Sequence, residues 1–274
     1  MGANRITGFL GRNGAGKSTT IKMLLGMARP TGGEGRVLGN RIDDPSESVE
    51  LRRQVAYVSE DKRLYGYMTV EQMIRFTSAF YPDWRADVAE ALLKKYELPP
   101  DRKVKSLSKG MRSKLALLLA LSRKPKLLIL DEPSEGLDPV GVEQLLESLV
   151  THCSDGTSVF FCSHQIEEVE RIADHVCILD RGRLLLDASL DDIRQSYRQI
   201  DLVFPFEPSG LQFQVAGVET VRTRGHQMSV FASGNTDEIV ERARALQASA
   251  VELTPVGLRE IFLRTIKEER NALV

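Results

Sequence analysis

The sequence predicts an α/β fold with a mainly parallel sheet, an inserted helical subdomain and a small C-terminal α+β module. Short apolar runs typical of strands alternate with helical patterns, which favours parallel strands joined through helices. The run Lys126–Glu132 is apolar almost throughout, as expected for a strand buried on both faces. We therefore predict a first domain over 1–195, containing a helical subdomain at about 61–125, and a module over 196–274.

Composition limits the function classes. The 274 residues carry 37 basic and 38 acidic side chains, a net charge of −1, and this balance argues against a nucleic-acid partner. The three cysteines lack metal-ligand spacing and fit a reducing compartment. No signal peptide is recognisable, and the longest apolar run, Leu115–Leu121, is too short to span a bilayer. Any membrane role therefore depends on a partner chain.

The first elements are a buried strand at Arg5–Leu10, a glycine-rich loop and a helix beginning at Thr19–Leu25. The loop fits G-x-x-x-x-G-K-[ST], in which backbone N–H groups and a helix N-terminus cradle phosphates. Lys17 adds a positive charge, and the Ser18 hydroxyl is placed for Mg²⁺. A glycine turn that only joins strand to helix is the simpler alternative, but the flanking strand and helix favour a phosphate site. The predicted nucleotide-binding residues are Gly11, Asn13, Gly14, Ala15, Gly16, Lys17, Ser18 and Thr19.

The next elements change from strand to helix. A turn and a short strand are expected within Gly32–Asn40, and a second buried strand over Arg52–Glu60. Helical spacing of apolar residues then runs through Thr69–Leu98. Ser108 opens a further helix, which Pro125 stops.

Two carboxylates, Asp131 and Glu132, close the apolar run Lys126–Glu132. Ligands of parallel sheets bind beyond the carboxyl ends of the strands, so both side chains are candidates for a site. Further alternation follows, with a helix at Gly141–Val150, a strand at Ser158–Cys162, a helix at Gln165–Ala173 and a strand at His175–Leu179.

The C-terminal module carries no catalytic pattern, so we expect a regulatory or dimer-supporting addition. A hairpin turn at Arg181–Arg183 precedes it. Thr254 is expected to cap its last helix. The predicted strands are Val203–Phe204, Phe213–Val215, Val218–Val221, Met228–Phe231 and Val251–Leu253, and the predicted helices are Asp237–Leu246 and Leu258–Ile266.

Five motifs follow one another in a recognisable order: the phosphate loop, Leu107–Met111, Leu128–Pro133, Gly136–Asp138 and Ser163–His164. In order and approximate spacing the chain resembles ATP-binding-cassette (ABC) ATPases over about residues 5–190, and looks like the ATP-binding subunit of a bacterial ABC transporter of exporter type. The resemblance implies a P-loop NTPase fold that hydrolyses ATP with Mg²⁺. It also implies transmembrane partner subunits, a second ATPase subunit, and a cytoplasmic location at the inner face of the membrane.

The resemblance assigns roles to single residues. Lys17 and the loop backbone would hold the β and γ phosphates, and Ser18 and Asp131 would hold Mg²⁺. Glu132 would activate the attacking water as general base, and His164 would contact the γ-phosphate. Taken alone, His164 is more simply a structural histidine; the order and spacing of the motifs together favour the catalytic role.

Three further roles concern contacts with other chains. Ser108 and Gly110 match the signature segment that contacts ATP bound by the other protomer, although Ser108 alone would read as a helix cap. Asp138 lies in the loop between the two sites. Glu60 stands where the family usually has glutamine, and we expect it to couple ATP to the partner.

The sequence departs from the family pattern in the signature, where Lys109 and Met111 replace smaller or amide residues. Only ten residues precede Gly11, and no aromatic residue comes before Phe9. Family members carry further strands there and an aromatic residue that stacks on adenine. We therefore expect an N-terminally shortened chain or a weakened nucleotide binder. The alternatives are a non-transport ABC ATPase and a weakly active ATP-sensing module.

Overall fold

The computed structural model describes residues 4–208, 213 and 215–272, which fall into two compact units. Contacts divide the chain into Met1–Asp187 and Ala188–Val274, ahead of the boundary expected at residue 195. The helix α8 (Leu190–Ser196), which the sequence reading did not include, accordingly falls in the second unit. Within the described residues, no helix has the length and apolar character needed to cross a membrane.

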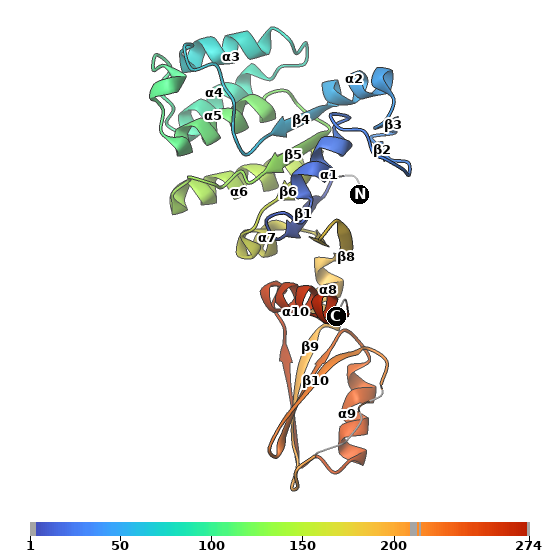
Figure 1. The fold of residues 1–274 in the computed structure, drawn as a ribbon. Helices are drawn as coiled ribbons and strands as arrows, with labels where there is room; N and C mark the ends of the chain where they lie inside the picture. Colours follow the sequence, from blue (N-terminus) through green and yellow to red (C-terminus); the bar gives the residue numbers. More distant parts are fainter. Residues whose placement is uncertain (1–3, 209–212, 214, 273–274) are drawn as a thin grey trace. The chain divides into compact units, whose positions relative to one another are not determined.

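A six-stranded sheet forms the centre of the first unit (Figure 1). Its order is β4-β5-β6-β1-β7-β8, and the pairs β4–β5, β5–β6, β6–β1 and β1–β7 are parallel, which confirms the predicted sheet type. Neighbouring parallel strands need crossover connections, and helices supply them. The strands are β1 (Ile6–Gly11), β4 (Val55–Val58), β5 (Leu127–Asp131), β6 (Ser158–Cys162), β7 (His175–Asp180) and β8 (Arg183–Ser189).

Helices cover both faces of this sheet, because alternate residues of each strand point to opposite faces. On one face, Phe9, Ile129 and Phe160 pack with Ile21 of α1 and Leu51 of α2. On the other face, α7 packs on β1 and α6 on β6. The helices concerned are α1 (Lys17–Leu24), α2 (Pro45–Gln54), α6 (Pro139–Ser154) and α7 (Ile166–Ile172).

The inserted helical subdomain consists of α3 (Val70–Ser78), α4 (Ala86–Lys95), the short 3₁₀ helix η1 (Val104–Ser106) and α5 (Lys109–Leu121). Both α3 and α4 pack on α5, and Figure 1 shows the three together. Thr69 and Gln72 form a reciprocal capping box at the start of α3.

The strand predicted over Arg52–Glu60 is wrong at its start, because residues 52–54 end α2 and only Val55–Val58 form β4. The Asp44 side chain accepts hydrogen bonds from two backbone amides in the first turn of α2, and Pro45 occupies its first position. Both are helix-start signals present in the sequence. Upstream, β2 (Arg36–Val37) and β3 (Asn40–Arg41) form a small hairpin where one short strand was expected.

The second unit contains an antiparallel sheet in the order β10-β11-β9-β12. Its core joins Ile200 and Leu202 of β9 and Val230 of β11 to Ile239 of α9. Its elements, besides α8, are β9 (Arg198–Val203), β10 (Val218–Arg224), β11 (Gln227–Ala232), α9 (Thr236–Ala245), β12 (Ala250–Pro255) and α10 (Leu258–Ala272).

Two local predictions for this unit are wrong. Thr254 does not cap the last helix, because it pairs with Gln199 in the β12–β9 ladder and α10 begins at Leu258. Phe213 and Val215 are not in a strand, and residue 214 of that predicted strand lies outside the described residues.

Candidate functional site

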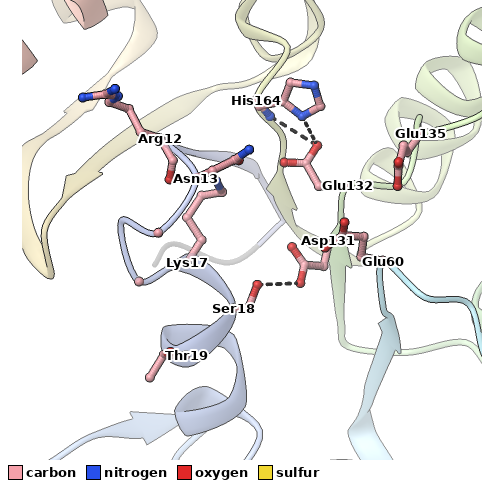
Figure 2. A pocket seen from close by; sticks show the side chains of 12 residues that line it. Arg12, Asn13, Lys17, Ser18, Thr19, Glu60, Asp131, Glu132, Glu135 and His164 are labelled. Atoms are coloured by element: carbon pink, nitrogen blue, oxygen red, sulfur yellow. Dashed lines mark hydrogen bonds and ion pairs between the residues drawn. The ribbon is translucent and has the colours of Figure 1, made fainter.

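A cavity of about 470 Å³ opens at the carboxyl ends of β1 and β5, where α1 begins (Figure 2). The side chains around it come from the glycine loop, the ends of β4, β5 and β6, and the segments that follow them. Its lining residues are Arg12, Asn13, Gly14, Gly16, Lys17, Ser18, Thr19, Glu60, Asp131, Glu132, Glu135 and His164.

The glycine loop takes a backbone shape that its sequence permits. Gly14 and Gly16 have φ values of 80° and 110°, a region that side chains disfavour, and Gly16 is the N-cap of α1. The Lys17 ammonium donates to the Gly11 carbonyl at 2.7 Å and reaches the Arg12 carbonyl at 3.4 Å. The loop thus presents the N-terminus of α1 and a held lysine to the cavity, an arrangement that suits anionic groups.

Two predicted nucleotide-binding residues do not line the cavity. Gly11 ends β1, and a Cβ atom there would lie 2.6 Å from the Leu179 carbonyl oxygen, so only glycine allows this approach. Ala15 is buried, and its carbonyl accepts a hydrogen bond from the Gly182 amide at 2.8 Å. Both residues therefore anchor the loop to β7 and the turn that follows it.

Ser18 and Asp131 face each other across the cavity floor in Figure 2, from α1 and β5. The Ser18 hydroxyl donates to Asp131 Oδ2 at 3.2 Å, and Asp131 is buried. One hydroxyl and one carboxylate oxygen this close fit the oxygen ligands that Mg²⁺ prefers.

Glu132 turns toward His164 and away from Ser18. Glu132 Oε2 lies 2.7 Å from His164 Nδ1 and 3.3 Å from the His164 amide nitrogen. The Glu132 carboxylate is almost buried, whereas half of the His164 side chain is exposed. A carboxylate held by an exposed imidazole can take a proton from a water molecule in the cavity. The structure therefore brings Lys17, Ser18, Asp131, Glu132 and His164 into one site.

Three predicted site residues, Ser108, Gly110 and Asp138, lie outside this cavity. None of them is among the described residues that line it. Ser108 caps α5 by accepting from the Met111 amide at 3.1 Å, and Asp138 caps α6. A Cβ atom on Gly110 would lie 2.7 Å from the Gly136 carbonyl oxygen, so the start of α5 packs directly on the loop before Asp138.

Sequence reasoning missed Arg12 and Glu135 in the cavity wall and Lys62 beside it. The Lys62 ammonium donates to the Glu132 carbonyl at 3.0 Å, and burial lowers the pKa of Lys62. Glu135 forms an ion pair with Lys109 at 2.6 Å, and the Lys109 hydrogen bond holds the pKa of Glu135 below its usual range. Of these three residues, only Arg12 lies inside the glycine motif. Lys62 and Glu135 make contacts with segments distant in the sequence, and such contacts leave no local sequence pattern.

The glycine-loop motif lies between a strand of a parallel sheet and the N-terminus of a helix, and another strand of the sheet, β5, leads into the carboxylates of Asp131 and Glu132. This combination defines the P-loop NTPase class. Family comparison narrows this class. The family model described as ABC transporter matches residues 1–135. An uncharacterised ABC transporter ATP-binding protein of Alkalihalophilus pseudofirmus is 33% identical over 206 residues, which is 73% of this chain and 75% of the relative.

Two further similarities extend the comparison. The Nod factor export ATP-binding protein I of Neorhizobium galegae is 32% identical over 277 residues, covering 97% of this chain and 78% of that protein. A solved structure of an ATP-binding subunit of an ABC transporter superposes with a TM-score of 0.64 at 34% identity, covering 70% of this chain and 82% of the other.

The chain belongs to the ABC transporter ATP-binding family. It is an ATPase subunit that powers transport, and it has the fold that the sequence resemblance implied. ATP-binding subunits of this family work with transmembrane subunits.

Proposed function

We propose that this chain hydrolyses Mg²⁺-ATP in the cavity beside Lys17 and uses the energy to drive export through transmembrane partners. The export direction is supported by the Nod factor export relative, whose similarity extends over 97% of this chain. The observation that carries the catalytic part is the Glu132–His164 pair at 2.7 Å beside Asp131.

ATP phosphates would lie against the loop amides at the start of α1, with Lys17 neutralising their charge. The Lys17 ammonium is already oriented by the Gly11 and Arg12 carbonyls, so little reordering is needed on binding. Phosphoryl transfer is catalysed mainly by such positioning and charge neutralisation.

Ser18 and Asp131 would hold Mg²⁺ through the two oxygens that now lie 3.2 Å apart. A bound Mg²⁺ would supply positive charge that stabilises the negative charge developing on the phosphates. Asp131 suits this role because burial at the end of β5 fixes its side chain.

Glu132 would act as the general base, accepting a proton at its carboxylate from the attacking water. His164 holds Glu132 Oε2 through its ring nitrogen and its backbone amide, and its exposed ring can contact the γ-phosphate. A positioned general base contributes about 10²–10⁴-fold in rate.

A second ATPase subunit would complete the site. The exposed Ser108 and the neighbouring Gly110 lie at the N-terminus of α5, where backbone amides suit the phosphates of ATP on the facing subunit. Direct packing of Gly110 on Gly136 supports a link from this signature segment to Asp138, and so between the two sites.

Transmembrane partners would dock on the helical subdomain, which would place the chain at the cytoplasmic face of the membrane. A groove of about 210 Å³ runs between the segment after β4 and helices α3 and α5. Beside it, Tyr65, Tyr67, Phe76 and Phe80 are exposed and form a chain of ring contacts. Contiguous exposed aromatic surface of this kind marks interaction sites. Glu60 lines the ATP cavity and belongs to the same segment after β4, so it would couple ATP hydrolysis to the docked partner.

The test is Glu132→Gln, which keeps shape and removes the base. ATP binding is expected to persist, turnover to fall about 10²–10⁴-fold, and ATP to trap a dimer visible by size-exclusion chromatography with light scattering. Glu147→Gln on α6, an exposed glutamate paired with Lys95, is the matched control and is expected to behave as wild type. Turnover that survives Glu132→Gln contradicts the proposed mechanism, and a wild-type chain that binds ATP without turnover favours the ATP-sensing alternative.

A further inference from the structure

We propose that Lys62 is a positioning residue that holds the backbone of Glu132 and connects it to the segment 59–64 at the docking groove. The inference rests on the proposed role of Glu132 as general base. Lys62 lies outside all five sequence motifs, and only the fold brings its side chain to a motif residue, Glu132.

Lys62 is buried, which is rare for lysine unless its charge is paired. Its ammonium donates to the main-chain carbonyl of Glu132 at 3.0 Å, across 70 positions of sequence. A charged donor to a carbonyl in a buried setting makes a strong and directional hydrogen bond. Lys62 therefore holds the backbone of Glu132, the residue whose side chain is the proposed base.

The backbone of Glu132 needs such support. Its φ of 48° lies in the left-handed region that residues other than glycine avoid, and such conformations persist only where surrounding contacts enforce them. The Glu132 amide donates to the Cys162 carbonyl at 3.0 Å, and its carbonyl also accepts from the Glu135 amide at 3.3 Å. Of these three hydrogen bonds with the Glu132 backbone, the one from Lys62 is made by a side chain and the other two are made by backbone groups.

Lys62 sits in a tight turn directly after β4. Its amide donates to the Ser59 carbonyl at 3.2 Å, and its own φ is 43°. From this turn Glu60 reaches the ATP cavity, while Lys62, Arg63 and Leu64 line the docking groove. A displacement of the turn by a docked partner would thus reach Glu132 through one hydrogen bond.

Burial lowers the pKa of Lys62, and the nearby carboxylates of Glu135, Glu60 and Glu132 oppose this shift, whereas Lys109 adds to it. Glu135 pairs with Lys109 of the signature segment at 2.6 Å, and both residues line the same pocket as Lys62. Lys62 therefore joins the turn to Glu132, and the shared pocket places this turn beside the signature segment.

The experiment compares Lys62→Met, Lys62→Gln and Lys62→Arg with Lys103→Met, a control at an exposed lysine of the same subdomain. ATPase kinetics of the purified full chain are expected to show kcat reduced about 10- to 100-fold in Lys62→Met and Lys62→Gln, with KM for ATP changed less than about two-fold. Lys62→Arg is expected to recover most of kcat, because guanidinium can also donate to the carbonyl. Lys103→Met is expected to match wild type.

A second readout separates positioning from general damage. In a Glu132→Gln background, adding Lys62→Met is expected to leave ATP-driven dimer formation unchanged, because binding and closure do not need an oriented base. Loss of that dimer, or a raised KM in all three Lys62 variants, would show a structural role only and overturn the inference. Wild-type kcat in Lys62→Met or Lys62→Gln would overturn it as well. Failure of the proposed function is distinguishable, since in that case Glu132→Gln alone would still hydrolyse ATP.

Discussion

Gly8 in β1 offers a test of how tightly the helix that follows His164 is packed on the sheet. An alanine Cβ at this position would lie 2.1 Å from Val169 Cγ1 of α7, where ordinary contact begins at 3.4 Å. Val169 is fully buried. Gly8→Ala therefore requires a displacement of about 1.3 Å in a closely packed layer, and overpacking of this kind costs about 1–3 kcal/mol.

An opposing effect makes the sign of the result informative. Replacing glycine by alanine within a strand reduces the entropy of the unfolded chain and stabilises by about 0.5–1 kcal/mol. The net expectation for Gly8→Ala is a loss of about 1–2 kcal/mol, or a fall in Tm of about 2–8 °C for a unit of this size.

Val169→Ala provides the matched background. It removes Cγ1 and leaves Val169 Cβ at 3.4 Å and Ala173 Cβ at 3.5 Å as the nearest atoms, both ordinary contacts. Alone it is expected to cost about 2 kcal/mol, from two methyl groups and the cavity they leave. In this background, Gly8→Ala is expected to become neutral or stabilising by about 0.5–1 kcal/mol.

Urea unfolding followed by tryptophan fluorescence measures this cycle within one unit, because Trp84 is the single tryptophan of the chain and lies in the first unit. The three variants and wild type give a coupling energy between positions 8 and 169. If Gly8→Ala stabilises the wild-type background, or costs the same in both backgrounds, then the contact with Val169 does not limit packing and the steric reasoning is wrong.

Two further predictions concern Glu60 and Glu168. Glu60→Ala is expected to keep ATP binding but to lower partner-stimulated hydrolysis about ten-fold or more, because the substitution removes one oriented polar group from the site. Unchanged stimulation and transport in reconstituted complexes would contradict the proposed coupling role of Glu60. Burial raises the pKa of Glu168 above 4.5, and its Oε2 lacks a hydrogen-bond partner in the described structure. Ionisation is therefore harder in the folded state, so wild type is expected to lose stability relative to Glu168→Gln as pH rises from about 4 through the raised pKa, by about 1 kcal/mol. Equal differences in unfolding free energy at pH 4 and pH 7.5 would contradict this.

Motif spacing predicts which residues meet at the cavity because the fold fixes where strand ends lie. Asp131 and the glycine loop are 112 or more positions apart, yet β5 and β1 are parallel strands whose carboxyl ends share one edge. The Ser18–Asp131 hydrogen bond follows from that topology. The resemblance assigned Glu132 and His164 to the same ATP site, but the hydrogen bond between their side chains was not predicted and is seen only in the structure.

Other features depend on tertiary pairing and left no sequence pattern that we used. Thr254 has the side chain of a helix cap, but its backbone is taken by the β12–β9 ladder. Lys62 looks like an ordinary charged residue of a turn until the fold places Glu132 beside it. The start of α2 is different, because Asp44 and Pro45 carried a readable signal that the strand-like apolar run after it obscured.

The conformation of Glu132 explains how two neighbouring carboxylates can serve one cavity. Consecutive residues of a strand point to opposite faces, so Asp131 and Glu132 in a regular strand could not both line the site. The strand ends at Asp131, and the left-handed φ of Glu132 turns its side chain toward His164. Leaving the favoured backbone regions costs about 1–2 kcal/mol. Hydrogen bonds from Lys62 and to the Cys162 carbonyl, each contributing about 1 kcal/mol or more, are of the size needed to offset it. The geometry of Glu132, the proposed base, is therefore determined by contacts from two other segments, so we expect a change at either segment to alter hydrolysis even where no motif residue is replaced.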